Sequence, residues 1–70
     1  MRYAVVIEQG KTSYGAYVPD LPGCIAAGST REEAVKLIQE AVIVHIEDLK
    51  KKGEAVPQPS STVEFIDVAA

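Results

Sequence analysis

The sequence predicts a small α+β domain in which one helix covers one face of a four-stranded sheet. Three short strand-like segments come first, a long amphipathic helix follows, and an alternating segment comes after it. The 70 residues leave room for one domain, over residues 1–70. A domain of this size buries a smaller fraction of its surface on folding than a larger domain does, so its stability is marginal. We therefore expect the order β-β-β-α-β, with the second sheet face open to solvent or to another chain.

The first three strands are expected at residues 2–8, 13–18 and 24–27. The first segment is rich in β-branched and aromatic side chains, and the third is short and apolar. Gly15 inside the second indicates a bulge or a close packing contact. Between the second and third strands, Pro19-Asp20-Leu21-Pro22-Gly23 predicts a rigid turn, because each proline fixes its own φ.

The helix is the most strongly predicted element. Thr30 and Glu33 have the spacing of a capping box, in which the hydroxyl accepts a backbone N–H and the glutamate reaches back. Apolar positions then recur with a helical period, so one face should be buried. These positions are Ala34, Ile38, Ala41, Val42, His45 and Leu49. Three lysines at residues 50–52 suit the negative end of the helix dipole, and Gly53 is the expected stop.

The chain after the helix is expected to return to the sheet. Residues 57–61 carry two prolines and two serines and predict an extended connector. Apolar and polar residues alternate over Thr62–Val68, which predicts a fourth strand. If this strand runs parallel to the third, the crossover through the helix should be right-handed.

Composition and charge exclude several classes of function. The chain has 7 Lys+Arg against 10 Asp+Glu, a net charge of -3 and no basic stripe, so direct nucleic acid binding is not expected. One cysteine and one histidine cannot build a Cys/His zinc site, and a disulfide framework is impossible. The first apolar run is too short for a signal peptide or a membrane span. We expect no metal, no cofactor, no membrane contact and a cytoplasmic location.

One motif is specific. The string Gly15-Ala16-Tyr17-Val18-Pro19-Asp20-Leu21-Pro22-Gly23-Cys24, then Ala27-Gly28 and the helix start at Thr30, resembles the HicB family of antitoxins. The segment from Gly53 to Ser60 is similar to the family's post-helix segment, so the likeness covers nearly the whole chain. The resemblance implies a truncated ribonuclease-H-like fold with a mixed sheet of order 3-2-1-4.

The same resemblance implies a partner. HicB-type antitoxins bind and neutralise small basic RNA-cleaving toxins of HicA type, by occluding the toxin's active site. Many members also carry a C-terminal helix-turn-helix or ribbon-helix-helix module for operator DNA. This sequence holds no such module, so we expect no operator binding by this chain alone.

The turn between the second and third strands holds the candidate partner-binding residues, which are Tyr17, Asp20, Leu21 and Pro22. A structural role is the alternative, since turn geometry explains both prolines and Gly23. In that case Asp20 forms an Asx-turn and Leu21 folds back on the core.

Self-association is also expected. The core is small, and one sheet face lacks a helical cover. Ile43 lies about 140° from the centre of the apolar helix stripe, and Val44 flanks it. We therefore predict Ile43 and Val44 as an interface of a homodimer or a larger homo-oligomer.

No catalytic residue is expected. Cys24 with His45 as its base would need a third group to orient the histidine, and a buried, inert thiol is favoured. His45 is expected to be buried and hydrogen-bonded. The acids show no convergence of the kind that ribonuclease H chemistry requires. The favoured function is thus a protein-binding antitoxin. A free-standing homo-oligomer without a toxin, or least of all a residual ribonuclease-H-type hydrolase, is the alternative.

Overall fold

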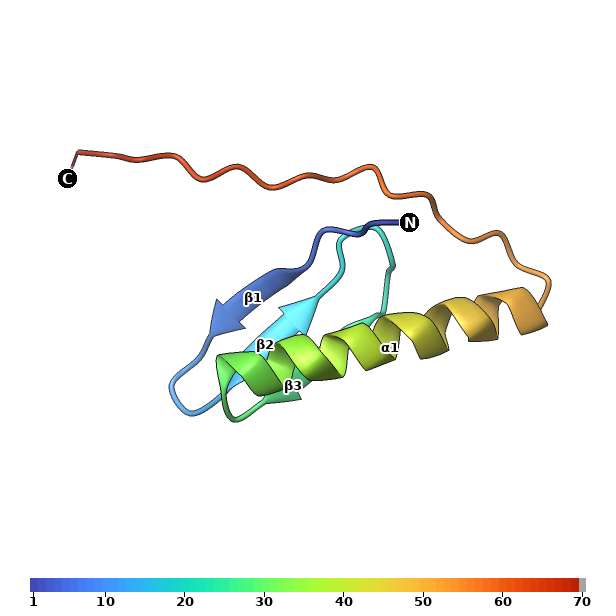
Figure 1. The fold of residues 1–70 in the computed structure, drawn as a ribbon, viewed down its shortest axis with the longest axis horizontal. Coiled ribbons are helices and arrows are strands. Elements are labelled where there is room, and N and C mark those ends of the chain that lie inside the picture. The colour runs from blue at the N-terminus through green and yellow to red at the C-terminus, as the bar shows by residue number, and fades with distance from the viewer. Residues whose placement is uncertain (70) are drawn as a thin grey trace.

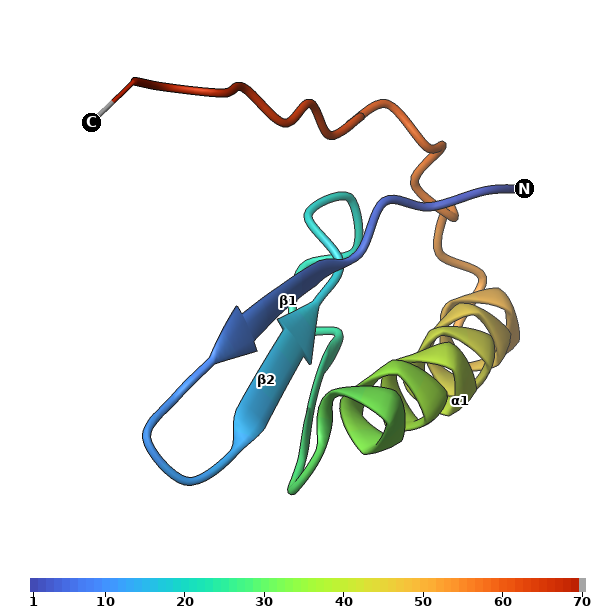
Figure 2. The same cartoon turned by 60° about the vertical axis from the view of Figure 1, so that its left-hand side comes forward.

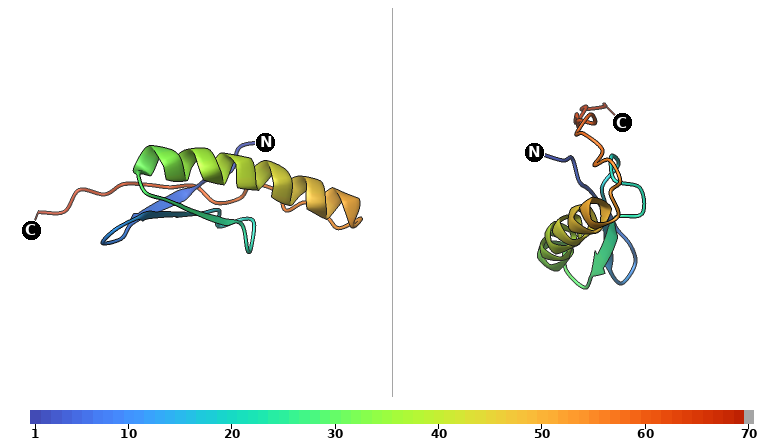
Figure 3. Two further views of the ribbon diagram at one scale, coloured as in Figure 1. Left: turned by 90° about the horizontal axis from the view of Figure 1, so that it is seen from below. Right: turned by 90° about the vertical axis from the view of Figure 1, so that its right-hand side faces the viewer.

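The computed structural model describes residues 1–69, which form three strands and one helix (Figure 1). The strands are β1 (Val6–Gln9), β2 (Tyr14–Tyr17) and β3 (Ile25–Gly28), and the helix is α1 (Arg31–Lys51). Both strand pairings are antiparallel, in the order β1-β2-β3. The sheet and α1 form two layers (Figure 3). The α+β class is confirmed, and the strand order agrees with the 3-2-1 part of the expected sheet.

The expected fourth strand is not formed among residues 1–69. Residues 62–68 pair with no strand among the described residues, and the sheet has three strands. Residues 62–69, here called the tail, instead run in an extended path on the β1 side (Figures 1 and 2). The molecule measures 48 × 26 × 16 Å as a result. The outer edge of β1 is left open.

The sheet register sorts the side chains onto two faces. Ile7, Ala16 and Ala26 lie in one row across the three strands, on the face toward α1. Because side chains alternate along a strand, their neighbours form a row on the opposite face. This outer row consists of Val6, Tyr17 and Ile25. The side chains of the first row therefore pack toward the core, and no helix in the described chain covers those of the outer row.

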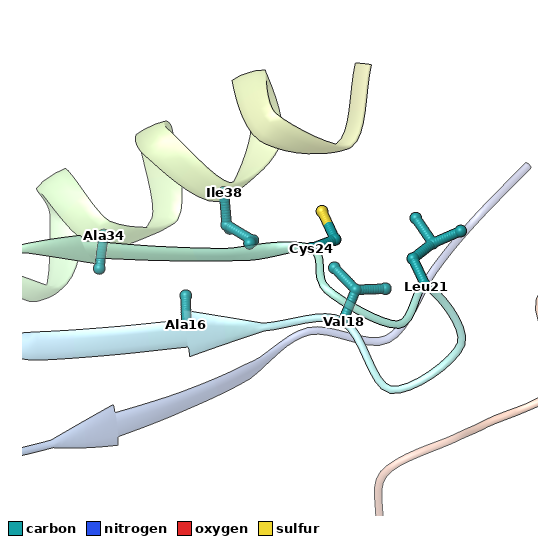
Figure 4. Packing of buried hydrophobic residues seen from close by; sticks show 6 residues of the cluster. All are labelled: Ala16, Val18, Leu21, Cys24, Ala34 and Ile38. Atoms are coloured by element: carbon teal, nitrogen blue, oxygen red, sulfur yellow. The ribbon is translucent and has the colours of Figure 1, made fainter. Parts of the chain in front are cut away.

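The core lies between the sheet and α1 (Figure 4). Its buried members are Ala16, Val18, Leu21, Cys24, Ala34 and Ile38. Leu21 and Ile38 are the largest side chains that are fully buried. Since Leu21 comes from the segment between β2 and β3, this connection is part of the core. Burial raises the pKa of the Cys24 thiol, which favours its protonated, unreactive form.

The connection between β2 and β3 consists of two consecutive reverse turns, over residues 18–21 and 21–24. In each turn the last N–H donates to the first carbonyl, at 3.1 Å and 3.0 Å. Pro19 and Pro22 both occupy the second position, where their fixed φ fits. Gly23 follows with a φ of +84°, as the third position of a type II turn requires. The predicted rigid turn is confirmed.

Both ends of α1 agree with the prediction. The Thr30 Oγ1 accepts the N–H of Glu33 at 3.1 Å. The carboxylate of Glu33 accepts the N–H of Ser29 at 2.7 Å, one residue earlier than in a standard capping box. At the other end, two hydrogen bonds from the N–H groups of Gly53 and Glu54 close the helix in a Schellman motif.

The first turn of α1 packs against β3 at Gly28. A Cβ placed there would lie 2.7 Å from the Ala34 nitrogen and 3.0 Å from the Cβ of Glu33. No real Cβ tolerates such a contact with a backbone atom, so the helix approaches this close only because residue 28 has no side chain. The helix therefore lies mainly over β3 and covers β1 least.

Asp20 holds the chain that follows the helix. Its Oδ2 accepts the N–H groups of Ser60 and Ser61, each at 2.9 Å, and its Oδ1 accepts their hydroxyls at 3.1 and 2.8 Å. The Tyr3 hydroxyl also donates to the Pro57 carbonyl. The Ser61 N–H, followed by the Ser60 N–H, favours the charged carboxylate and lowers the pKa of Asp20 from 3.8 to about 2.

We predict that Gly28→Ala destabilises the fold, because the added Cβ pushes the first turn of α1 off β3. The expected loss is about 1–3 kcal/mol in the free energy of unfolding, measured by urea denaturation. Gly15→Ala is the matched control, since a Cβ there meets no atom within 4 Å. Equal losses in the two variants would contradict the close-approach argument.

The second prediction concerns the attachment through Asp20. The folded-state pKa of Asp20 lies below its ordinary value. The hydrogen bonds of its carboxylate therefore stabilise the fold above pH 3.8, and this stabilisation is lost as the pH falls toward 2. The protection factors of the Ser60 and Ser61 amides, which correct for the pH dependence of intrinsic exchange, should fall over that window. Asp20→Ala should remove their protection at neutral pH, and Asp67→Ala on the exposed tail should not. Protection of both serines that survives in Asp20→Ala would show that the carboxylate does not hold them.

Candidate functional site

The outer face of the sheet is a candidate binding surface. Tyr17 and Ile25 stand next to each other on β2 and β3, and Ile25 is 71% exposed. A shallow hollow along this face also includes Pro22, with the carboxylate of Glu8 at its border. We call Tyr17, Pro22 and Ile25 the outer patch. A partly exposed aromatic ring, a proline and an isoleucine together suit a protein partner more than a small charged ligand.

The structure separates the four partner-binding candidates into two pairs. Tyr17 and Pro22 are exposed and belong to the outer patch. Leu21 has no exposed surface, since it folds back on the core as the structural alternative anticipated. The Asp20 carboxylate bonds to Ser60 and Ser61, which lie forty residues further along the chain, rather than to its own turn. Leu21 and Asp20 thus have structural roles, and Tyr17 and Pro22 are the two of the four candidates that the outer face exposes.

Ile25 is the surface residue that sequence reasoning missed. Its segment was recognised only as a short apolar strand. The alternation of that strand carries the missing signal: Cys24 is buried and Ala26 packs against the core, so Ile25 between them must point outward.

A second hollow lies between β3 and α1. Its lining includes Ile25 and Val44, the latter from the predicted oligomer interface, together with the acidic residues Glu40 and Asp48. The outer edge of β3 has no strand partner among residues 1–69. An open strand edge beside two acids could receive an extended basic segment. Ile25 belongs to both hollows.

His45 borders this second hollow and is only partly buried, which corrects the expectation of a buried histidine. The two buried residues of α1 are Ala34 and Ile38, both in its first half. The second half extends past the strands (Figure 1), so residues there lose their cover although they lie on the apolar stripe.

Ile43 and Val44, the predicted oligomer interface, are both exposed on α1, at 61% and 64%. Val44 lines the second hollow, whereas Ile43 does not. The two side chains are therefore available to a partner, as an interface requires.

The acids and the Cys24 thiol bear on the question of catalysis. No three His, Cys, Asp or Glu side chains in the described part of the chain are grouped so as to hold a metal ion. Cys24 is buried and its thiol pKa is raised, whereas a nucleophilic thiol needs a lowered one. Between residues 1 and 69, no helix has both the length and the apolar character needed to cross a bilayer.

Comparison with known proteins identifies relatives over the whole domain. Residues 3–69 match the family described as HicB_like antitoxin of bacterial toxin-antitoxin system. A UPF0150 protein of Thermoplasma acidophilum is 40% identical over 62 residues, which are 87% of this chain and 90% of that protein. Antitoxin HicB 2 of Photorhabdus laumondii is 34% identical over 71 residues, and this chain spans 51% of its length.

Two solved structures share the fold. A chain of the HicA3 and HicB3 toxin-antitoxin complex superimposes with a TM-score of 0.73 at 35% identity, over 86% of this chain and 70% of that one. The N-terminal domain of the Burkholderia pseudomallei antitoxin HicB gives 0.71 at 36% identity, over 83% and 69%. In sequence and in fold, this chain belongs to the HicB-like antitoxin family.

Proposed function

We propose that this chain is an antitoxin that binds a small basic RNA-cleaving toxin of HicA type and neutralises it by occluding the toxin's active site. The observation that carries the proposal is the similarity to a chain of the HicA3 and HicB3 toxin-antitoxin complex, over 86% of this chain. The net charge of -3 is complementary to a basic partner and unsuited to direct nucleic acid binding. The cytoplasmic location stays a prediction.

The outer patch is the contact surface that we propose for the toxin. Tyr17 supplies an aromatic ring, a residue type enriched among those that dominate binding energies. Ile25 and Pro22 extend it with apolar surface that is already exposed and held on a strand and a closed turn. The preformed geometry lowers the entropy lost on binding. Glu8 adds a negative charge at the border of the patch.

Binding rather than catalysis is the activity that the site supports. The ribonuclease-H-type hydrolase remains the least favoured alternative, because two-metal chemistry needs acids that converge on one point. The alternative of a homo-oligomer without a toxin rests on a separate observation, the exposure of Ile43 and Val44. The two proposals use different side chains, although Ile25 of the outer patch and Val44 line the same hollow between β3 and α1.

The antitoxin proposal predicts that the purified chain stops RNA cleavage by a purified HicA-type toxin at stoichiometric concentration. Tyr17→Glu should weaken inhibition at least tenfold, because a charge at the centre of an apolar contact is costly. Gln39→Glu, which adds the same charge on an exposed helix position, should inhibit like the unmodified chain.

Two outcomes would contradict this account. Undiminished cleavage with the unmodified chain in excess would remove the antitoxin function. If Glu40→Lys abolishes inhibition while Tyr17→Glu does not, the toxin uses the hollow between β3 and α1, and the proposed surface is wrong.

The helix interface generates its own prediction. Ile43→Asp should lower the mass of the assembly in light scattering and leave the midpoint of urea unfolding nearly unchanged, because the side chain is 61% exposed. Gln39→Asp serves as the charge-matched control on α1. A mass equal to that of the unmodified chain would count against the interface.

A further inference from the structure

The tail concentrates exposed apolar side chains. Nine large hydrophobic residues are exposed within the described chain, and four of them fall between residues 63 and 68. These four are Val63, Phe65, Ile66 and Val68. Phe65 is 94% exposed. An extended segment with unpaired backbone and such side chains is a strand that lacks a sheet.

The outer edge of β1, for its part, has no paired strand among the described residues. β1 pairs only with β2, so one side of its backbone has no partner among the described residues. Since α1 lies mainly over β3, it leaves Val5, just before β1, and Ile7, within β1, only partly buried. A strand placed along this edge would satisfy the free backbone groups and cover both side chains.

The tail does not fill this edge within its own copy. Asp20 holds Ser60 and Ser61, and the chain beyond them runs beside β1 at a distance (Figures 1 and 2). Val63 and Phe65 face Ile7 across a shared open space. No strand pairing joins the two segments. One chain therefore presents both a free strand and a free edge, and leaves them unjoined.

We propose that two copies of this chain exchange their tails, so that residues 62–68 of each pair with the outer edge of the other's β1. Each sheet then has four strands, in the order β3-β2-β1-tail, which is the order that the family resemblance implies. We assign a second copy of this chain to the free edge of β1, because each copy carries both a free edge and an unpaired tail. A two-fold axis therefore forms the contact twice.

The side chains of the tail suit this position. In a regular strand, Phe65 points to one face and Ile66 to the other. With Phe65 over Ile7 on the helix side, Ile66 and Val68 continue the outer row beside Val6. Asp67 shares the helix side with Phe65, and Arg31 lines the space between Phe65 and Ile7, so the charges on this side are complementary.

An isotope-filtered NMR experiment on the full chain tests the exchange. Labelled and unlabelled copies are unfolded, mixed in equal amounts and refolded together. We expect NOEs between the Phe65 ring of one copy and the Ile7 methyl groups of the other, with slowed amide exchange over residues 63–68. Such NOEs within one copy only, or a monomer whose tail amides exchange freely, would overturn the proposal.

Matched tail variants give a second readout. Phe65→Asp should raise the dimer dissociation constant at least tenfold, whereas Ala69→Asp, with the same charge beyond the apolar run, should change it less than twofold. Equal effects of the two would overturn the exchange. The NOEs distinguish it from association through Ile43 and Val44, and the absence of toxin keeps the result independent of the antitoxin proposal.

Discussion

The contact between the first turn of α1 and β3 at Gly28 governs the rest of the structure. Because residue 28 has no Cβ, the helix backbone approaches this strand closely and lies over one side of the sheet. Ile38 and Leu21 are both fully buried in the core beneath it. The same placement leaves β1 poorly covered and the opposite face of the sheet bare. The candidate toxin surface and the candidate exchange edge are both consequences of where α1 lies.

Local features of this fold could be predicted from the sequence because their causes are local. Thr30 and Gly53 determine the ends of α1 through hydrogen bonds within a few residues. Pro22 and Gly23 determine a turn through their own backbone preferences. Tyr17 was predicted only as a partner-binding candidate, and the burial of Ala16 and Val18 on either side of it shows that its ring lies on the outer face.

Features that depend on distant partners could not be predicted. Asp20 looked like a turn or a partner-binding residue, and only the folded chain brings Ser60 and Ser61 to its carboxylate. Leu21 was ambiguous for the same reason, since its burial depends on α1. The alternation over residues 62–68 predicts a strand but not which edge it joins. The alternation of apolar and polar residues is the same whether the strand pairs with an edge of its own chain or with an edge of another chain.

The two proposed surfaces have different roles: the outer patch binds the toxin, and the β1 edge and the tail join two copies of the chain. A core of six buried residues is modest, and tail exchange would add apolar cover where α1 provides least. The outer patch lies on the sheet face away from α1, but Ile25 also lines the hollow next to Val44, so the toxin surface and the helix interface meet at that hollow. Asp20 connects the two regions, because the connection between β2 and β3 that carries Pro22 also holds Ser60 and Ser61, just before the tail.

The central claim is that the outer patch receives the toxin. The most direct test is amide and methyl shift mapping of the labelled chain during titration with a catalytically inactive HicA-type toxin. The account predicts the largest shifts at Tyr17 and Ile25, with α1 residues beyond Ile38 little affected. Shifts confined to Ile43, Val44 and the second half of α1 would contradict it.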